Sequence, residues 1–160
     1  MKNILTILIA IFCGVSVSAQ ITPAQKTFYY QKNAKIATKS YDDSPVVEVS
    51  IEAGKNLVFF YEWQSAKNPM IADADRTDKL YFELTPEQAK SFQASGDELA
   101  KISTIRCRLC FCLDGGCRPD TKGILTVKKT SCGKYAVTFK DGPDVERVLV
   151  NETFTLKKEK

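Results

Sequence analysis

Five cysteines in the second half of the chain are the residues best suited to chemistry. They are Cys107, Cys110, Cys112, Cys117 and Cys132, and a glycine pair at 115–116 precedes the fourth. A C-x-x-C-x-C spacing can gather thiolates on a metal ion. In an oxidising compartment the same thiols form disulfides instead. The compartment therefore decides between the two chemistries.

The first residues of the chain predict that compartment. A lysine at position 2 precedes the apolar run from Ile4 to Phe12, and Val17-Ser18-Ala19 supplies the small residues that signal peptidase recognises. The run is too short to span a bilayer, which requires about 20 apolar residues. We therefore predict a signal peptide over residues 1–19, with cleavage after Ala19. A single β domain over residues 20–160 should follow, secreted or periplasmic.

Lipid anchoring at Cys13 is the alternative. The lipidated cysteine would then become the N-terminus, but Phe12 stands just before it, where a small residue is normally needed. Export as a soluble protein removes Cys13 and leaves five cysteines. Five thiols allow two disulfides and leave one cysteine that is buried, reactive or joined to a partner.

Loop lengths suggest possible cysteine pairs, although the connectivity and the identity of the unpaired cysteine stay open. Cys112 and Cys117 enclose Leu-Asp-Gly-Gly, which lets them face each other across the mouth of a hairpin. A second bond from Cys107 or Cys110 to Cys132 would close a loop of about 25 residues and stabilise the fold by about 3.5 kcal/mol. We expect no metal and no other cofactor, with a cysteine metal-binding module as the alternative.

Composition narrows the functional classes. The chain contains no histidine, which excludes Ser-His-Asp and Cys-His nucleophile systems and histidine-liganded zinc. Its 23 lysines and arginines are interspersed with 19 aspartates and glutamates, so no basic stripe indicates nucleic-acid binding. We therefore predict a protein that is not an enzyme, binds no nucleic acid and does not insert into a membrane.

Alternation of apolar and polar residues predicts strands in the first half of the chain. We expect them at residues 26–31, 46–52, 57–63 and 80–84, with the second and third joined as a hairpin through Ala53–Asn56. The aromatic residues and Trp63 along the third strand are expected in the core. A capping pattern at Thr85-Pro86-Glu87-Gln88 predicts one short helix that ends near Gln93, and residues 97–101 can add a further turn.

The second half should contain further strands at residues 105–111, 123–130, 134–140 and 145–157. The last three form an antiparallel meander. Glu152 falls on the apolar face of the final strand, so we expect a β-bulge near Asn151 or a barrel end there. The fold class is therefore mainly β, an antiparallel sandwich or small barrel of seven to eight strands with one short helix.

Residues 64–78 interrupt the alternation and form a long connection of the kind that is often functional or mobile. Asp73, Asp75 and Asp78 offer carboxylates that a calcium ion can use. Their spacing does not match an EF-hand loop, so a solvated acidic loop is the favoured interpretation.

The candidate binding site is the loop that the cysteines close. Its residues are Arg108, Leu109, Phe111, Leu113, Asp114 and Arg118. A disulfide-closed, glycine-turned loop on a β-scaffold is preorganised, so little ordering entropy is lost when it docks into a cleft. Protease inhibitors use such loops.

The start of the mature chain at Gln20 and the cysteine-rich, Gly115–Gly116-turned β-meander resemble small secreted β-barrel proteins of Bacteroidota, a group that includes the potempin protease inhibitors. The resemblance implies secretion and inhibition of a peptidase, and it assigns no site residues. We predict a non-catalytic binding protein, most sharply a protease inhibitor whose partner is a peptidase. The alternative is a structural or accessory cell-envelope protein whose disulfides only stabilise the fold.

Overall fold

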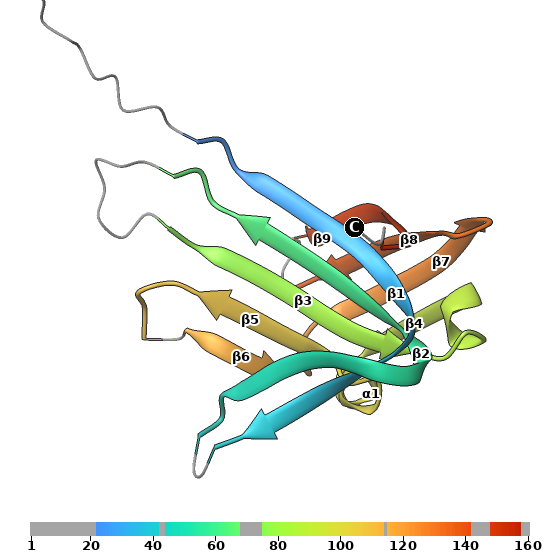
Figure 1. Cartoon of the computed structure of the whole chain (residues 1–160), viewed down its shortest axis with the longest axis horizontal. Coiled ribbons are helices and arrows are strands. Elements are labelled where there is room, and N and C mark those ends of the chain that lie inside the picture. The colour runs from blue at the N-terminus through green and yellow to red at the C-terminus, as the bar shows by residue number, and fades with distance from the viewer. Residues whose placement is uncertain (1–21, 42–43, 68–74, 114, 142–147, 158–160) are drawn as a thin grey trace, which may run out of the picture.

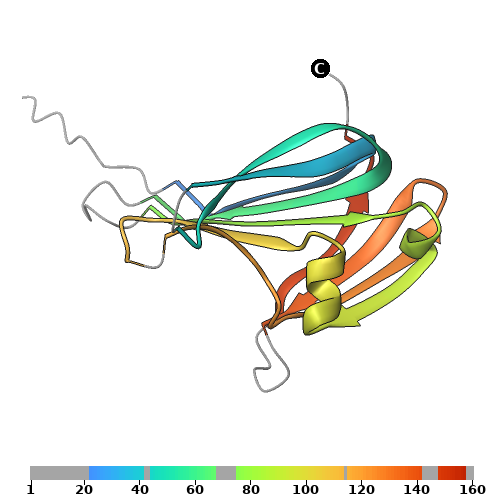
Figure 2. The same ribbon diagram turned by 90° about the horizontal axis from the view of Figure 1, so that it is seen from below.

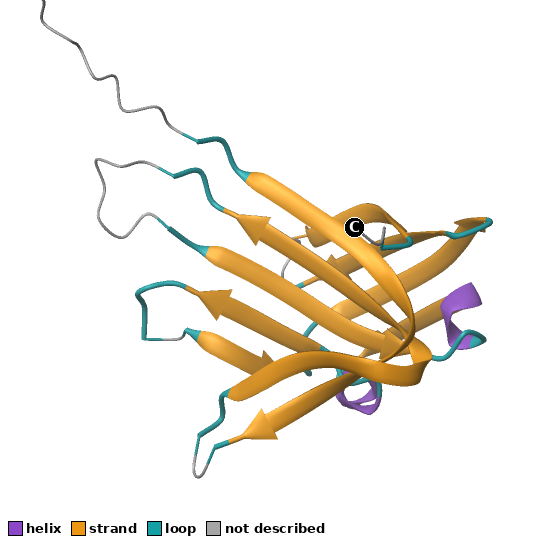
Figure 3. Ribbon diagram, viewed as in Figure 1, coloured by secondary structure: helices purple, strands orange, loops and turns teal. Residues whose placement is uncertain are grey.

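The structure is a computed structural model of the chain and describes residues 22–41, 44–67, 75–113, 115–141 and 148–157. The predicted signal peptide at residues 1–19 lies outside this range. Strands dominate the described residues, as predicted, and form two antiparallel sheets with two very short helices (Figure 3). The number of strands in these residues is nine, slightly more than the seven to eight expected.

The first sheet has five strands in the order β1-β2-β3-β5-β6 (Figure 1). Their bounds are β1 (Gln25–Ser40), β2 (Val47–Gln64), β3 (Thr77–Leu84), β5 (Ile105–Leu109) and β6 (Gly116–Pro119). The second sheet has the order β4-β7-β8-β9. Its strands are β4 (Ser91–Ser95), β7 (Ile124–Ser131), β8 (Lys134–Lys140) and β9 (Val148–Thr155). The predicted C-terminal three-stranded meander is confirmed as β7, β8 and β9.

The core lies between the sheets, where their inward side chains meet. Phe59 of β2 stacks on Phe82 of β3 with ring centroids 4.7 Å apart. The same ring meets Tyr135 of β8 edge-on at 5.4 Å and lies 5.9 Å from Phe154 of β9. Large aromatic side chains bury much apolar area and prefer such offset or edge-to-face contacts. This ring cluster therefore joins the two sheets.

The inward faces that alternation predicted are buried in three strands of the structure. The alternating apolar residues of β3, β7 and β8 each have a relative exposure of 7% or less: Leu80, Phe82, Leu84, Leu125, Val127, Tyr135, Val137 and Phe139. Because successive side chains of a strand point to opposite faces, the apolar pattern is sufficient to choose the buried face.

The hairpin predicted within residues 46–63 is wrong. These residues form the single strand β2, and both of its halves pair with β1. Gly54, expected in a turn, is instead a point of close approach between the strands. A Cβ atom there would lie 2.7 Å from the carbonyl carbon of Ala34. A register shift at Ala34 marks the same point, and beyond it the long strand pair bends (Figure 1).

The predicted helix at residues 86–93 is also wrong in extent. The capping contacts form, since Thr85 N donates to Gln88 Oε1 at 3.0 Å and Gln88 N donates to Thr85 Oγ1 at 3.2 Å. The helix that follows is only a 3-10 turn, η1 (Gln88–Lys90). Residues 91–95 then join the second sheet as β4, because pairing with β7 buries Ala94 and packs Phe92 against the core. Long-range pairing here overrides a local helix signal.

The further turn expected at residues 97–101 is the short helix α1 (Asp97–Lys101), which buries Leu99. In β9 a register shift occurs between Val148 and Val150, and it leaves Glu152 on the inward face. Its carboxylate forms an ion pair with Lys26 of β1 at 2.5 Å, so an acid on this face is compensated by the other sheet. Leu156, just beyond the end of β9, is 45% exposed.

The two sheets overlap only in part. They adjoin along β1 and β9, where Lys157 N donates to Tyr30 O at 2.9 Å. Figure 2 shows the five-stranded sheet continuing past the second sheet toward the end that carries the β5–β6 connection. In the described ranges, no helix has the length and apolar character that crossing a membrane requires. The overhanging end of the first sheet therefore carries the candidate binding loop.

Candidate functional site

We name the last residue of β5 and the connection to β6, residues 109–115, the tip. Disulfides join Cys107 to Cys117 at its base and Cys110 to Cys112 within it. Cys132 is the free cysteine of the described residues, and it is exposed. Two disulfides and one thiol were predicted for this region, and that number is confirmed.

The predicted pairing of the cysteines is wrong. Cys107 and Cys117 are register partners in the antiparallel ladder of β5 and β6, so the ladder itself places their side chains together. Cys112 therefore cannot pair with Cys117 and bonds to Cys110 instead. Cys132 lies in the turn between β7 and β8, at the opposite end of the molecule from the tip (Figure 1).

The tip presents apolar side chains to solvent. Phe111 is 94% exposed, Leu113 108% and Leu109 44%. These three account for most of the large apolar side chains that are exposed among the described residues. Asp114, a fourth predicted site residue, lies outside the described range. Grouped exposed apolar residues often mark a surface that contacts another molecule.

One half of the disulfide at the base of the tip is buried. Cys107 has a relative exposure of 0% and faces away from the second sheet. The Val46 end of β2 covers this side: a Cβ atom on Gly116, which has φ of 105°, would lie 2.8 Å from Val46 Cγ1. The Cys107–Cys117 bond therefore anchors a projecting apolar loop to a packed part of the sheet.

Arg108 and Arg118 were predicted to belong to this loop, but the structure places them elsewhere. Both lie on strands next to the tip and face the overlap between the sheets. Arg108 lines a cavity there, with its Nε 3.4 Å from Asp78 Oδ1. Arg118 lines a second, more polar hollow beside Arg106 and Asp120. The predicted residues thus divide between an apolar tip and a cationic wall.

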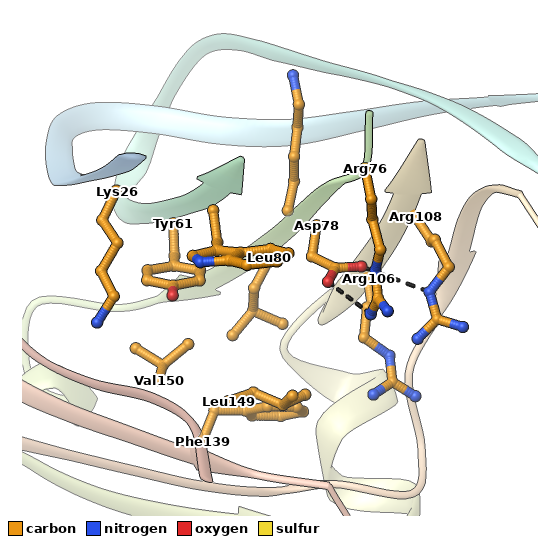
Figure 4. A pocket seen from close by; sticks show the side chains of 12 residues that line it. Lys26, Tyr61, Arg76, Asp78, Leu80, Arg106, Arg108, Phe139, Leu149 and Val150 are labelled. Atoms are coloured by element: carbon orange, nitrogen blue, oxygen red, sulfur yellow. Dashed lines mark hydrogen bonds and ion pairs between the residues drawn. The ribbon is translucent and has the colours of Figure 1, made fainter. Parts of the chain in front are cut away.

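The cavity of about 250 Å³ opens between the overhanging sheet and the edge of the second sheet (Figure 4). Strands β1, β2, β3 and β5 provide one wall, and β8 and β9 provide the other. The lining residues are Lys26, Tyr61, Trp63, Arg76, Asp78, Lys79, Leu80, Arg106, Arg108, Phe139, Leu149 and Val150. The wall from the second sheet is entirely apolar, whereas the first sheet contributes every charge.

The strand register explains why these charges meet. Trp63, Asp78 and Arg108 are successive partners across β2, β3 and β5, so they form one row of the inner face. Arg76 lies just beyond that row, where its backbone N donates to Ser65 Oγ at 2.9 Å. Its guanidinium NH2 lies 2.6 Å from Asp78 Oδ2. Asp78 therefore contacts two guanidinium groups at one side of the cavity.

The other cations of the lining are paired to acids that stand outside it. Arg106 contacts Asp120 at 3.0 Å and Asp141 at 2.6 Å. Lys79 contacts Glu62 at 2.9 Å. A hydrogen bond to Glu152 raises the pKa of Lys26, which stays protonated near neutral pH. Carboxylates behind the lining thus hold its cations in place.

The sequence patterns did not indicate the cavity. Trp63 was expected in the core, and it does pack against the core from a partly buried position while also lining the cavity. The sequence feature that could have indicated the cavity lies in β5, where Arg106 and Arg108 alternate with the buried Ile105 and Cys107. Two arginines on one inward face of a strand require acids opposite them.

The two described aspartates of the acidic loop contact different partners. Asp75 contacts Lys67 at 3.6 Å, whereas Asp78 belongs to β3 and contacts the arginines. Asp73, the third proposed calcium ligand, lies outside the described residues. Within the described part of the chain, no three acidic or cysteine side chains are grouped as metal ligands.

No protein-family model matches the sequence, and searches of curated proteins and of solved structures found no match. The function is therefore inferred from the chemistry of the tip and of the cavity.

Proposed function

We propose that this chain is an exported, non-catalytic binding protein whose tip docks into a cleft of a partner protein, and that the partner is a peptidase. The observation that supports the proposal is the near-complete exposure of Phe111 and Leu113 on a loop with a disulfide at its base and another inside it. Two large apolar side chains in water forgo the free energy that their burial would release, so their exposure is easiest to explain if a partner covers them.

The geometry of the tip also suits docking into a cleft. Two crosslinks restrict the tip before binding, so little conformational entropy remains to be lost when a partner orders it. Substrate clefts of peptidases accept apolar side chains from narrow, projecting segments. The disulfides themselves support export, because such bonds persist mainly in oxidising compartments.

A direct test is to immobilise the mature protein and measure binding of peptidases purified from the secretome of the producing organism. The double variant Phe111→Ser with Leu113→Ser should weaken binding at least tenfold, which is about 1.4 kcal/mol. Its melting temperature should stay close to that of the wild type, because exposed substitutions rarely change stability by more than about 0.5 kcal/mol.

Leu156→Ser is the matched control, because Leu156 is also large, apolar and exposed but lies outside the tip. This variant should bind as the wild type does. If the tip variant retains full binding, or if no secreted peptidase binds or is inhibited, the proposal is wrong. The disulfides would then only stabilise the hairpin, as expected if the chain is a structural envelope protein.

A further inference from the structure

The cavity between the sheets differs from the tip in both position and chemistry. We propose that it binds a small monocarboxylic acid with an apolar body, whose carboxylate lies at Arg76 and whose apolar part lies between the sheets. This site is separate from the tip and does not depend on the peptidase proposal.

The charge of the lining supports an anionic ligand. Four cationic side chains, those of Lys26, Arg76, Arg106 and Arg108, face the cavity against one carboxylate, that of Asp78. Lys79 also borders the cavity, but it pairs with Cys107 and points to the opposite face of the sheet. Figure 4 shows Arg76, Arg106 and Arg108 close to Asp78 at one side, with Lys26 at the opposite side. Cavities lined mainly by one sign of charge concentrate ligands of the opposite sign.

Arg76 has an unused donor. Its Nε is buried and finds no hydrogen-bond partner among the described residues. A buried donor without a partner is costly, and a ligand oxygen would relieve that cost. The guanidinium presents its donors in a planar fork that matches a carboxylate. The carboxylate of the ligand should therefore accept from Arg76.

The net charge of the surroundings favours a monoanion over a phosphate dianion. Lys26 and Arg106 each already contact a carboxylate, at 2.5 and 3.0 Å respectively. These pairs reduce the positive potential that remains for a ligand. A single negative charge is therefore better matched than two.

The rest of the lining fixes the character of the ligand body. The second sheet contributes only Phe139, Leu149 and Val150, and Trp63 and Leu80 face them from the first sheet. At about 250 Å³ the cavity is smaller than a pocket for a drug-sized ligand, which begins at about 300 Å³. The ligand should therefore be a short aliphatic or aromatic acid.

Burial raises the pKa of Tyr61, so its hydroxyl keeps its proton near neutral pH. Tyr61 therefore offers a neutral donor and adds no negative charge to the cavity.

Trp63 provides the readout, because it is the single tryptophan of the chain and lines the cavity. We would titrate the mature protein with octanoate and follow tryptophan emission. Octanol tests the apolar body without the charge, acetate tests the charge without the body, and inorganic phosphate tests a multivalent anion. Octanoate should saturate with a Kd below about 1 mM, and the other three should bind at least tenfold more weakly.

Arg76→Gln should weaken octanoate binding at least tenfold, while Arg76→Lys should retain part of it. Lys128→Gln is the matched control, since it removes one positive charge from the exposed face of β7 and should leave binding unchanged. The comparison among ligands needs no variant, so it remains decisive if an Arg76 variant fails to fold. No saturable response to octanoate, equal binding of octanol, or wild-type affinity in Arg76→Gln would overturn the proposal.

Discussion

Gly54 shows how a single residue shapes the first sheet. It lies in β2 opposite the register shift at Ala34, and its φ is not among the positive values that other glycines of the chain adopt. With free space around it, an alanine would stabilise the protein by about 0.4–1 kcal/mol, because it restricts the unfolded chain. The backbone of Ala34 removes that space, since it lies 2.7 Å from the point that a Cβ atom on this glycine would occupy.

We therefore predict that Gly54→Ala lowers the free energy of unfolding by about 1–3 kcal/mol, as overpacking of a tight contact does. Denaturant unfolding should show a lower midpoint with an unchanged slope. Ala53→Ser, at the exposed neighbouring position, should unfold as the wild type does. A more stable Gly54→Ala variant would show that the glycine marks flexibility and not a close approach.

At the scale of elements, the β5–β6 hairpin holds two disulfides with different roles. The Cys107–Cys117 bond spans ten positions of sequence and links two paired strands beneath Val46. The Cys110–Cys112 bond spans only two positions and lies in the tip. The first crosslink constrains a longer segment of the unfolded chain, so it should contribute more to stability.

Replacing Cys107 and Cys117 together with serine should lower the free energy of unfolding by about 3 kcal/mol, because the loop constraint is lost and a buried position becomes polar. The same change at Cys110 and Cys112 should cost about 1.5 kcal/mol or less. Thermal unfolding of both double variants under non-reducing conditions checks the order. Equal losses would contradict the roles assigned to the two bonds.

At the scale of the whole molecule, both candidate sites lie where the first sheet extends past the second (Figure 2). Arg108 follows Cys107 at the base of the tip and points into the cavity, so the two sites are neighbours on opposite faces of β5. One face of β5 carries the disulfide covered by Val46, and the other carries the charged lining of the cavity. Incomplete overlap of the sheets thus exposes a groove that a fully matched sandwich would close.

Buried and half-buried tyrosines should make the whole molecule sensitive to alkali. Burial raises the pKa of Tyr29, Tyr61 and Tyr81 above the ordinary value of 10.0. The unfolded chain loses these protons near pH 10, while the folded chain keeps them to higher pH. The stability that these protonated phenols contribute is therefore fully present below pH 10 and is lost as pH rises above it.

We predict that the melting temperature falls as pH rises above about 10, and that tyrosinate absorbance from these residues appears together with unfolding. Tyr81→Phe should move the onset of this loss to higher pH, because it removes one of these phenols. An unchanged melting temperature between about pH 9 and 11 would contradict the prediction.

Period-two patterns in the sequence were enough to predict the fold class, the β7–β8–β9 meander and the buried faces of β3, β7 and β8. The reason is local: a strand alternates its side chains, so Leu80, Phe82 and Leu84 share a face whatever their neighbours are. The cysteine cluster likewise indicated a crosslinked loop near residues 107–117. Both inferences depend on residues close together in the chain.

Tertiary structure alone decided which segments meet. Residues 46–63 form one strand because β1 pairs with both of their halves. Residues 91–95 form a strand because they pair with the edge of β7. The register of β5 against β6 places Cys117 opposite Cys107. Residues from six strands come together to form the cavity at Arg76. Such pairings release free energy only when distant segments come together, so no local pattern specifies them.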